Sequence, residues 1–105
     1  MNKKLLEAES FRKLEKHQVA LSLYEEILQE SPNAEALQGA AYCAYHLHQL
    51  DEASRYSDLA LRSDSRLAIP HVIKAYVFNI NGEKEKSREE AKVALALDNN
   101  SPDVL

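Results

Sequence analysis

The side chains best able to bind a metal ion or attack a substrate are four histidines and one cysteine. His46 and His48 are two residues apart, so they point to different sides of a helix, and His17 and His71 lie far from them in the sequence. This is not the His and Cys spacing of a zinc site. Nothing in the sequence gives Cys43 the electropositive neighbour that a reactive thiolate needs. We therefore predict exposed or partly packed histidines, a structural thiol and no bound metal.

Two pairs of adjacent acids, Glu25-Glu26 and Glu89-Glu90, are the candidates for general acid-base catalysis. We expect both pairs on the outer side of helices, where solvated charges explain them better than catalytic carboxylates do. The sequence has no Gly-rich phosphate loop and no GxSxG or HExxH motif. These features predict that the protein is not an enzyme, has no catalytic residues and needs no cofactor.

The composition argues against several other classes of protein. The 105 residues carry a net charge of −4, and the basic residues are scattered rather than gathered into the patch that phosphate backbones require, so we expect no nucleic-acid partner. No stretch approaches the ~20 apolar residues of a membrane span. Glu7 and Glu9 interrupt the apolar run that an export signal needs after its first basic residues. Together with the single cysteine, these features predict a cytoplasmic protein with no membrane partner.

The elements that must position these residues are helices that recur along the chain. Ala, Leu, Glu and Lys are abundant, which favours helix almost everywhere. Segments 16–30, 49–63 and 83–97 align with offsets of 33 and then 34 residues, and small residues fall in register within them. The matched positions are Ala20, Ala53 and Ser87, followed by Ile27, Ala60 and Ala94.

Each unit contains two helical stretches separated by residues that end helices. In the second unit one stretch runs over about 34–47, and the next starts near Leu50. The Ser-Pro-Asn run at 31–33 ends the preceding helix. Pro70 suits a first helical turn, and the Asn-Gly pair at 81–82 stops that helix. Helices of ~12 residues are marginal alone in water, so these must be held by packing on one another.

With these units in view, the sequence resembles the tetratricopeptide repeat (TPR) family. The hallmark is a unit of about 34 residues with small residues at fixed places, aromatics between them and a closing proline. The resemblance implies an all-α superhelix, or solenoid, of three stacked helix-turn-helix repeats at 1–33, 34–67 and 68–101, with 102–105 as the start of a further helix or a tail. The residues that carry it are Ala8, Phe11, Ala20, Tyr24, Ile27 and Pro32, then Leu37, Ala40, Ala41, Ala53 and Ala60, then Ala75, Phe78, Gly82, Ser87 and Ala94.

The sequence also departs from the family pattern. Large apolar residues are usual at four positions that hold Lys4, Glu7, His71 and Lys74, and the closing proline is missing from the second and third units. The competing interpretation is another α-α repeat or a plain helical bundle.

The resemblance further implies a concave groove, lined by the first helix of each unit, in which protein segments commonly bind. Tyr42 and Tyr76 hold the same place in successive units, so we expect them to be neighbours across the stack, with Tyr45 on the same face as Tyr42. Each tyrosine could instead pack between helices; our hypothesis is that at least two of the three contact a partner. The aligned groove positions are Asn2, Leu5, Glu9 and Arg12, then Glu35, Gln38, Tyr42 and Tyr45, then Ile69, Val72, Tyr76 and Asn79.

Chaperone-binding members of the family hold a C-terminal carboxylate with lysine, arginine and asparagine at set groove positions. In this sequence those positions are Leu5, Glu9, Gly39, Ile69 and Ile73. None of them offers a side-chain donor to a carboxylate, apart from a protonated acid. We therefore predict that this chain has no such carboxylate clamp.

The last helix should have an apolar side with no cover, formed by Ala91, Ala94, Leu95 and Leu97. Stacked repeats normally need a polar cap at each end. We expect either that the chain is a fragment of a longer protein or that it covers this face by forming a homo-oligomer.

The leading functional hypothesis is a protein-protein interaction scaffold whose concave groove binds a peptide or helix of a partner protein. One alternative is a self-associating structural module. Another is a non-catalytic tethering or regulatory arm of a larger protein.

Overall fold

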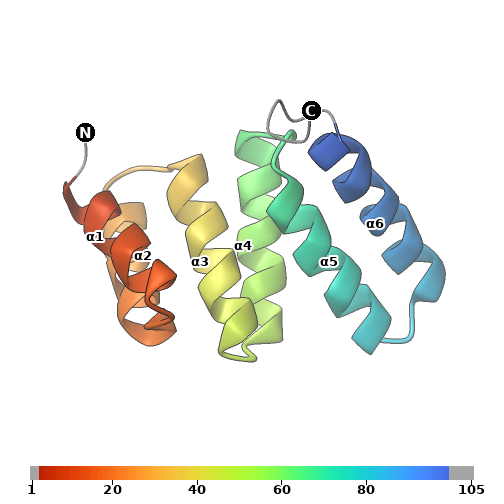
Figure 1. Ribbon diagram of the computed structural model, residues 1–105, viewed down its shortest axis with the longest axis horizontal. Coiled ribbons are helices and arrows are strands. Elements are labelled where there is room, and N and C mark those ends of the chain that lie inside the picture. The colour runs from red at the N-terminus through yellow and green to blue at the C-terminus, as the bar shows by residue number, and fades with distance from the viewer. Residues whose placement is uncertain (1–2, 100–105) are drawn as a thin grey trace.

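The computed structural model describes residues 3–99, which form six helices and no strand. Each helix packs on the next one along the chain (Figure 1), which confirms the predicted all-α architecture of consecutively stacked helices. The run at 102–105 and Asn2, for which we made predictions, lie outside the described residues. The helices are α1 (Lys3–Lys13), α2 (His17–Glu30), α3 (Ala34–His46), α4 (Leu50–Ser63), α5 (Ala68–Ile80) and α6 (Lys84–Asn99).

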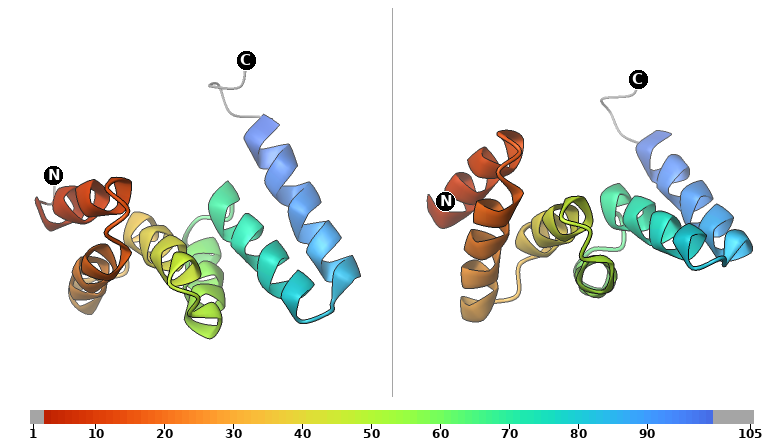
Figure 2. Two further views of the ribbon diagram at one scale, coloured as in Figure 1. Left: turned by 60° about the horizontal axis from the view of Figure 1, so that its bottom comes forward. Right: turned by 90° about the horizontal axis from the view of Figure 1, so that it is seen from below.

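The helices follow a curve whose inner face is formed by α1, α3 and α5. Helix α3 contacts both α1 and α5, in addition to its chain neighbours α2 and α4. Seen from below, α2 and α4 lie on the outer side of this curve (Figure 2, right), and α6 stands at its end. We call the surface of α1, α3 and α5 the inner face, and it is where the predicted groove residues lie.

The three turns within the helix pairs share one backbone geometry. A residue with positive φ follows each first helix: Glu15 at 61°, His48 at 62° and Gly82 at 81°. The next amide in each case donates to a carbonyl five residues back, as Gln49 does to Ala44 at 2.9 Å. This pattern of bonds ends a helix and satisfies its last carbonyls. Only the third turn uses glycine, so the sequence signal for this geometry is clear there and weak in the other two.

The core is built from small residues that let helices approach closely. Tyr24 and Ile27 are the large side chains fully buried among them, and Gly39 on α3 is buried directly against the Tyr24 ring. On α2, Val19 is 45% exposed whereas Leu21 is buried. The fully buried alanines are Ala8, Ala20, Ala36, Ala40, Ala41, Ala44, Ala53 and Ala60.

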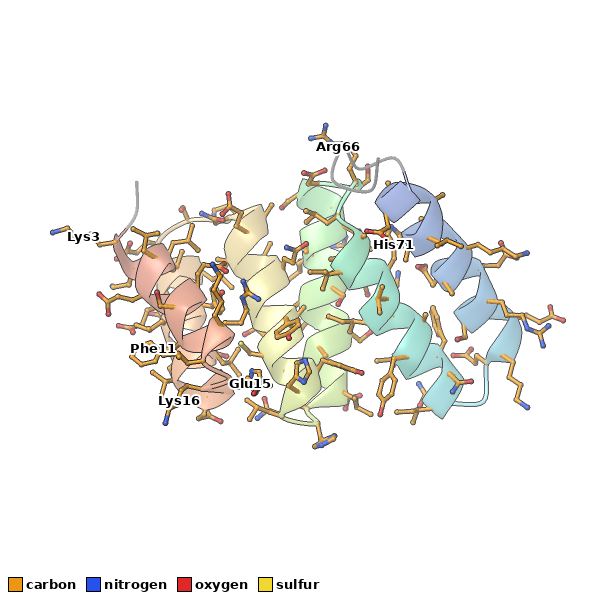
Figure 3. All side chains as sticks on the ribbon, in the orientation of Figure 1. Lys3, Phe11, Glu15, Lys16, Arg66 and His71 are labelled. Atoms are coloured by element: carbon orange, nitrogen blue, oxygen red, sulfur yellow. The ribbon has the colours of Figure 1, made fainter. Side chains whose placement is uncertain are left out.

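A polar cluster replaces apolar packing where α5 meets α4 and α6. Lys74 Nζ lies 2.9 Å from Asp58 on α4 and 3.7 Å from Glu90 on α6, and His71 Nδ1 lies 2.8 Å from Glu90. His71 stands on the α5 side of this junction (Figure 3). The expectation that Glu90 is a solvated surface acid is therefore wrong, because its side chain is only 19% exposed. Burial alone would lower the pKa of Lys74, but its bond to Asp58 and the nearby acids raise it.

Candidate functional site

A small cavity on the inner face brings three helices together. Glu9 and Arg12 come from α1, Gln38 and Tyr42 from α3, and Ile69 from α5, with the backbone of Gly39 between them. Its volume is about 50 Å³, which is room for a small group rather than for a whole ligand. Five of the predicted groove residues therefore line one common cavity.

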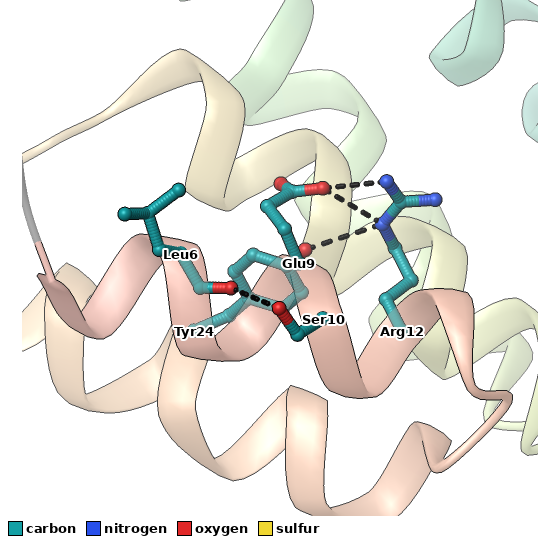
Figure 4. A network of polar contacts seen from close by, with 5 residues as sticks. All are labelled: Leu6, Glu9, Ser10, Arg12 and Tyr24. Carbon is teal, nitrogen blue, oxygen red and sulfur yellow. Dashed lines mark hydrogen bonds and ion pairs between the residues drawn. The ribbon is translucent and has the colours of Figure 1, made fainter.

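Arg12 is the centre of a network of polar contacts at this cavity (Figure 4). Its Nε donates to Glu9 Oε2 at 3.0 Å and to the Tyr24 hydroxyl at 3.3 Å, and its Nη2 also contacts the Glu9 carboxylate. The guanidinium carbon lies 5.4 Å from the centroid of the Tyr42 ring, within the range of a cation–π contact. Arg12 is thus held in place by one acid and two phenols.

The buried phenol of Tyr24 joins this network by accepting a hydrogen bond from Arg12. Burial first, and then the nearby Glu9 carboxylate, raise the pKa of Tyr24, while Arg12 opposes the rise. The hydroxyl therefore stays protonated at neutral pH and can remain a neutral partner of Arg12. Glu9 and Arg12 form an i, i+3 pair on one face of α1, which sets the charge of this end of the inner face close to zero.

A cluster of rings continues from Tyr42 along the inner face. The His17 and His46 rings are stacked at 4.7 Å with an interplanar angle of 6°, and Tyr42 packs on His46 at 4.4 Å. Tyr45 contacts His46 at 4.9 Å and meets Tyr76 of α5 edge-on at 4.8 Å. This cluster links α2, α3 and α5 through aromatic contacts.

The tyrosine pair that bridges α3 and α5 differs from the expected one. Tyr76 meets Tyr45, whereas Tyr42 contacts Arg12, His17 and His46. The residue that meets Tyr76 is thus three positions further along α3 than Tyr42.

The stacked histidines are a feature that sequence reasoning missed. His17 and His46 come from different helices, so their distance apart in the chain gives no signal of the contact. Burial first, and then the neighbouring His17, lower the pKa of His46. His17 Nδ1 is buried without a hydrogen-bond partner among the described residues. Nowhere in residues 3–99 do three His, Cys, Asp or Glu side chains gather in a way that could hold a metal ion.

A larger apolar cavity of about 440 Å³ lies between α5 and α6. Ile69 lines this cavity as well as the small one, so the two cavities share one residue. Val72 is 54% exposed and Leu95 is 60% exposed, although both are aliphatic. Small residues surround them, which leaves space between the two helices; the complete lining is Ala68, Ile69, Val72, Ala75, Ala91, Ala94, Leu95 and Asp98.

The remaining described groove residues line neither of these two cavities. Tyr45 and Tyr76 belong to the ring cluster, and Leu5 packs partly against the core. Asn79 and Glu35 are exposed on α5 and α3. Their role in binding stays a prediction.

Cys43 lies in the core beside the inner face. Its side chain is fully buried, and burial raises the pKa of the thiol to about 11. A thiol with such a pKa is protonated at neutral pH and is a poor nucleophile. This environment agrees with a structural role for Cys43.

Among known proteins, the chain is similar in fold to the second TPR of Spaghetti (RPAP3), solved bound to the HSP90 peptide SRMEEVD. The TM-score is 0.80 at 17% sequence identity, over 90% of this chain and 83% of that chain. No family model and no curated protein matches the sequence. No described helix is both long and apolar enough to span a bilayer. The protein therefore has the fold of a TPR domain, a superhelix of paired helices, as the sequence predicted.

Proposed function

We propose that the protein is a non-catalytic interaction scaffold, and that its inner face binds a peptide or helix segment of a partner protein. The observation that carries this proposal is the position of Ile69, which lines both the small polar cavity and the larger apolar one. A continuous surface therefore runs from Glu9 and Arg12 on α1 to Leu95 on α6. Exposed aliphatic groups arranged in a groove are typical of protein-binding sites.

The two ends of this surface favour different groups on the partner. At the α5 and α6 end, Ile69, Val72 and Leu95 would cover an apolar side chain. At the α1 and α3 end, the paired Glu9 and Arg12 together with Gln38 would suit a polar, uncharged group, because neither charge is left unbalanced. We expect a partner segment with an apolar anchor at one end and polar groups at the other, bound with a Kd in the micromolar range.

A selection from a peptide display library on the immobilised protein tests this proposal. Selected peptides would be measured by fluorescence polarisation with the wild type, with Val72→Asp in the groove, and with Val19→Asp on α2 outside it. The control is well matched, because both valines are exposed, at 54% and 45%. Binding that is lost in Val72→Asp and kept in Val19→Asp supports the inner face as the site. Equal binding by both variants, or none by any selected peptide, would overturn it.

Self-association is the second candidate, and the exposure of Leu95 favours it. The α5 and α6 cavity is apolar, and Leu95 stands at a position where the preceding units have the less exposed Leu28 and Leu61. A second copy could cover this face. Sedimentation equilibrium at several concentrations, with Leu95→Asp as the variant, distinguishes the candidates. A wild type that stays monomeric at all concentrations removes self-association and leaves the scaffold proposal standing.

We also propose a cytoplasmic location for this scaffold, and we keep the alternative that it forms an arm of a larger protein. The reduced state of the single buried Cys43 is compatible with a reducing compartment. Imaging of the tagged full reading frame in its native cell tests the location. The mass of the same tagged protein on a gel shows whether these residues are part of a larger protein.

A further inference from the structure

The outer side of the molecule holds a cleft of about 750 Å³ between α2 and α4 that the proposed function does not use. Leu28, Leu37 and Leu59 supply apolar surface in it, and Leu37, which is buried, comes from α3 at the bottom. The exposed side chains of Arg55 and Arg62 stand along its α4 wall. An apolar floor with a polar rim is the usual arrangement of a protein-protein contact.

The cleft is open because α2 and α4 each pack on α3 rather than on one another. One direct link crosses it, the hydrogen bond from the Tyr56 hydroxyl to Glu25 at 2.8 Å. Leu37 lines this space from α3, and the fully buried Ala40 lies about one turn further along the same helix. Neither side chain is long enough to fill the gap between the two outer helices.

The equivalent gap between α4 and α6 is closed by the protein's own side chains. The positions 34 residues after Leu37 and Ala40 hold His71 and Lys74. These two reach Glu90 and Asp58, at 2.8 and 2.9 Å respectively, and occupy the space with a hydrogen bond and an ion pair. Side chains of α5 thus occupy the gap between α4 and α6, whereas the gap between α2 and α4 stays open.

The charges around the open cleft indicate the chemistry of an occupant. Glu25 is bonded to Tyr56, and Arg55 is paired with Glu52 at 2.7 Å while stacking on the Tyr56 ring at 4.5 Å. Arg62 has no ion pair or hydrogen bond among residues 3–99. A cation is therefore unbalanced at one end of an apolar cleft, in a chain whose net charge is −4. An opposite charge on a partner would be attracted to this end.

We propose that the cleft between α2 and α4 is a second docking site, for an acidic amphipathic segment of another protein. Its apolar side chains would lie over Leu28, Leu37 and Leu59, and a carboxylate would pair with Arg62. Arg55, two helical turns earlier on α4, is already paired with Glu52, so Arg62 is the cation that a partner carboxylate would meet. Arginine and tyrosine are among the residue types enriched at binding hot spots.

The probe for this site is a fluorescein-labelled amphipathic peptide of about twelve residues, or three helical turns, built from Leu, Phe, Asp and Glu. Its counterpart carries Lys at every acidic position. We expect the acidic peptide to bind the wild type, the Lys peptide not to bind, and Arg62→Glu to weaken binding by at least about tenfold. Gln29→Lys, which adds a cation to the opposite wall, should strengthen binding a few-fold.

The matched control is Arg66→Glu, which makes the same charge change at an exposed position outside the cleft. Val72→Asp on the inner face separates this site from the proposed groove. The proposal is supported if Arg66→Glu and Val72→Asp both bind the acidic peptide like the wild type. It is overturned if Arg62→Glu and Arg66→Glu weaken binding equally, if the Lys peptide binds as well, if the acidic peptide does not bind, or if Val72→Asp abolishes binding.

Discussion

The ring of Tyr24 on α2 lies directly against the backbone of Gly39 on α3, and a Cβ atom at position 39 would overlap that ring. Tyr24 is fully buried, and its hydroxyl is bonded to Arg12 on the inner face. Because Gly39 has no side chain, the Tyr24 ring can lie in this position. Its hydroxyl then accepts a hydrogen bond from Arg12. The core of the first two helix pairs and the candidate groove are connected through these three residues.

Gly39→Ala should destabilise the fold by about 1–3 kcal/mol, because the Tyr24 ring cannot move away in a packed core. In an open helix the same change would stabilise by roughly 1 kcal/mol. Urea denaturation of Gly39→Ala, Tyr24→Leu and the double variant measures the coupling. We expect Gly39→Ala to lower the free energy of unfolding much less in the Tyr24→Leu background, where the ring is absent. An equal cost in both backgrounds would show that the overlap is not the cause.

His48→Gly should stabilise the protein by about 0.5–1 kcal/mol, because His48 has a φ of 62° in an exposed turn where glycine carries no steric penalty. The bond from its amide to Tyr45 does not depend on the side chain. Thermal denaturation measures the gain. His48→Ala is the control, since alanine keeps the Cβ atom and should bring no gain. A lower melting temperature for His48→Gly than for His48→Ala would contradict the role assigned to this backbone conformation.

The positions of the helices could be predicted from the sequence, whereas several contacts between them could not. Small residues such as Ala20 and Ala53 recur in register, and the Asn-Gly pair at 81–82 marks a helix end, so local patterns carried that information. Tyr76 on α5 meets Tyr45 on α3, a contact between two helices that no local pattern records. The burial of Glu90 has the same kind of cause, because its neighbours His71 and Lys74 come from another helix.

The peptide SRMEEVD should not bind this protein with a Kd below about 1 mM. The resemblance to chaperone-binding TPR domains places a carboxylate clamp at positions that here hold no lysine, arginine or asparagine, including Glu9 and Gly39. Arg12, which lies beside them, is already paired with Glu9. Isothermal titration with the free and the C-terminally amidated peptide measures this. Micromolar binding that disappears on amidation would mean that another cation serves as the clamp.

Cys43 should react with a disulfide reagent such as DTNB more than about a hundredfold more slowly than a free thiol, since it is fully buried and its pKa is raised to about 11. Adding urea within the native baseline should speed the reaction, because exposure of the thiol then requires opening of the fold. Cys43→Ser should cost about 1–3 kcal/mol by burying a hydroxyl, and Cys43→Ala is the control of similar size. Fast labelling of the folded wild type would contradict the buried position.

Stability should fall as the pH drops below about 6.5, the ordinary pKa of histidine, because burial and the neighbouring His17 lower the pKa of His46. The unfolded state then binds more protons than the folded state, so stability is complete above that pH and declines until the folded-state pKa is passed. His48 adds to this effect, Glu15 opposes it, and the uncharged Tyr42 and Tyr45 rings contact His46. Urea midpoints of wild type and His46→Gln between pH 5 and pH 8 test it. The carboxylates titrate alike in both proteins, so the difference isolates the imidazole, and parallel curves would show that the stacked histidines do not sense pH.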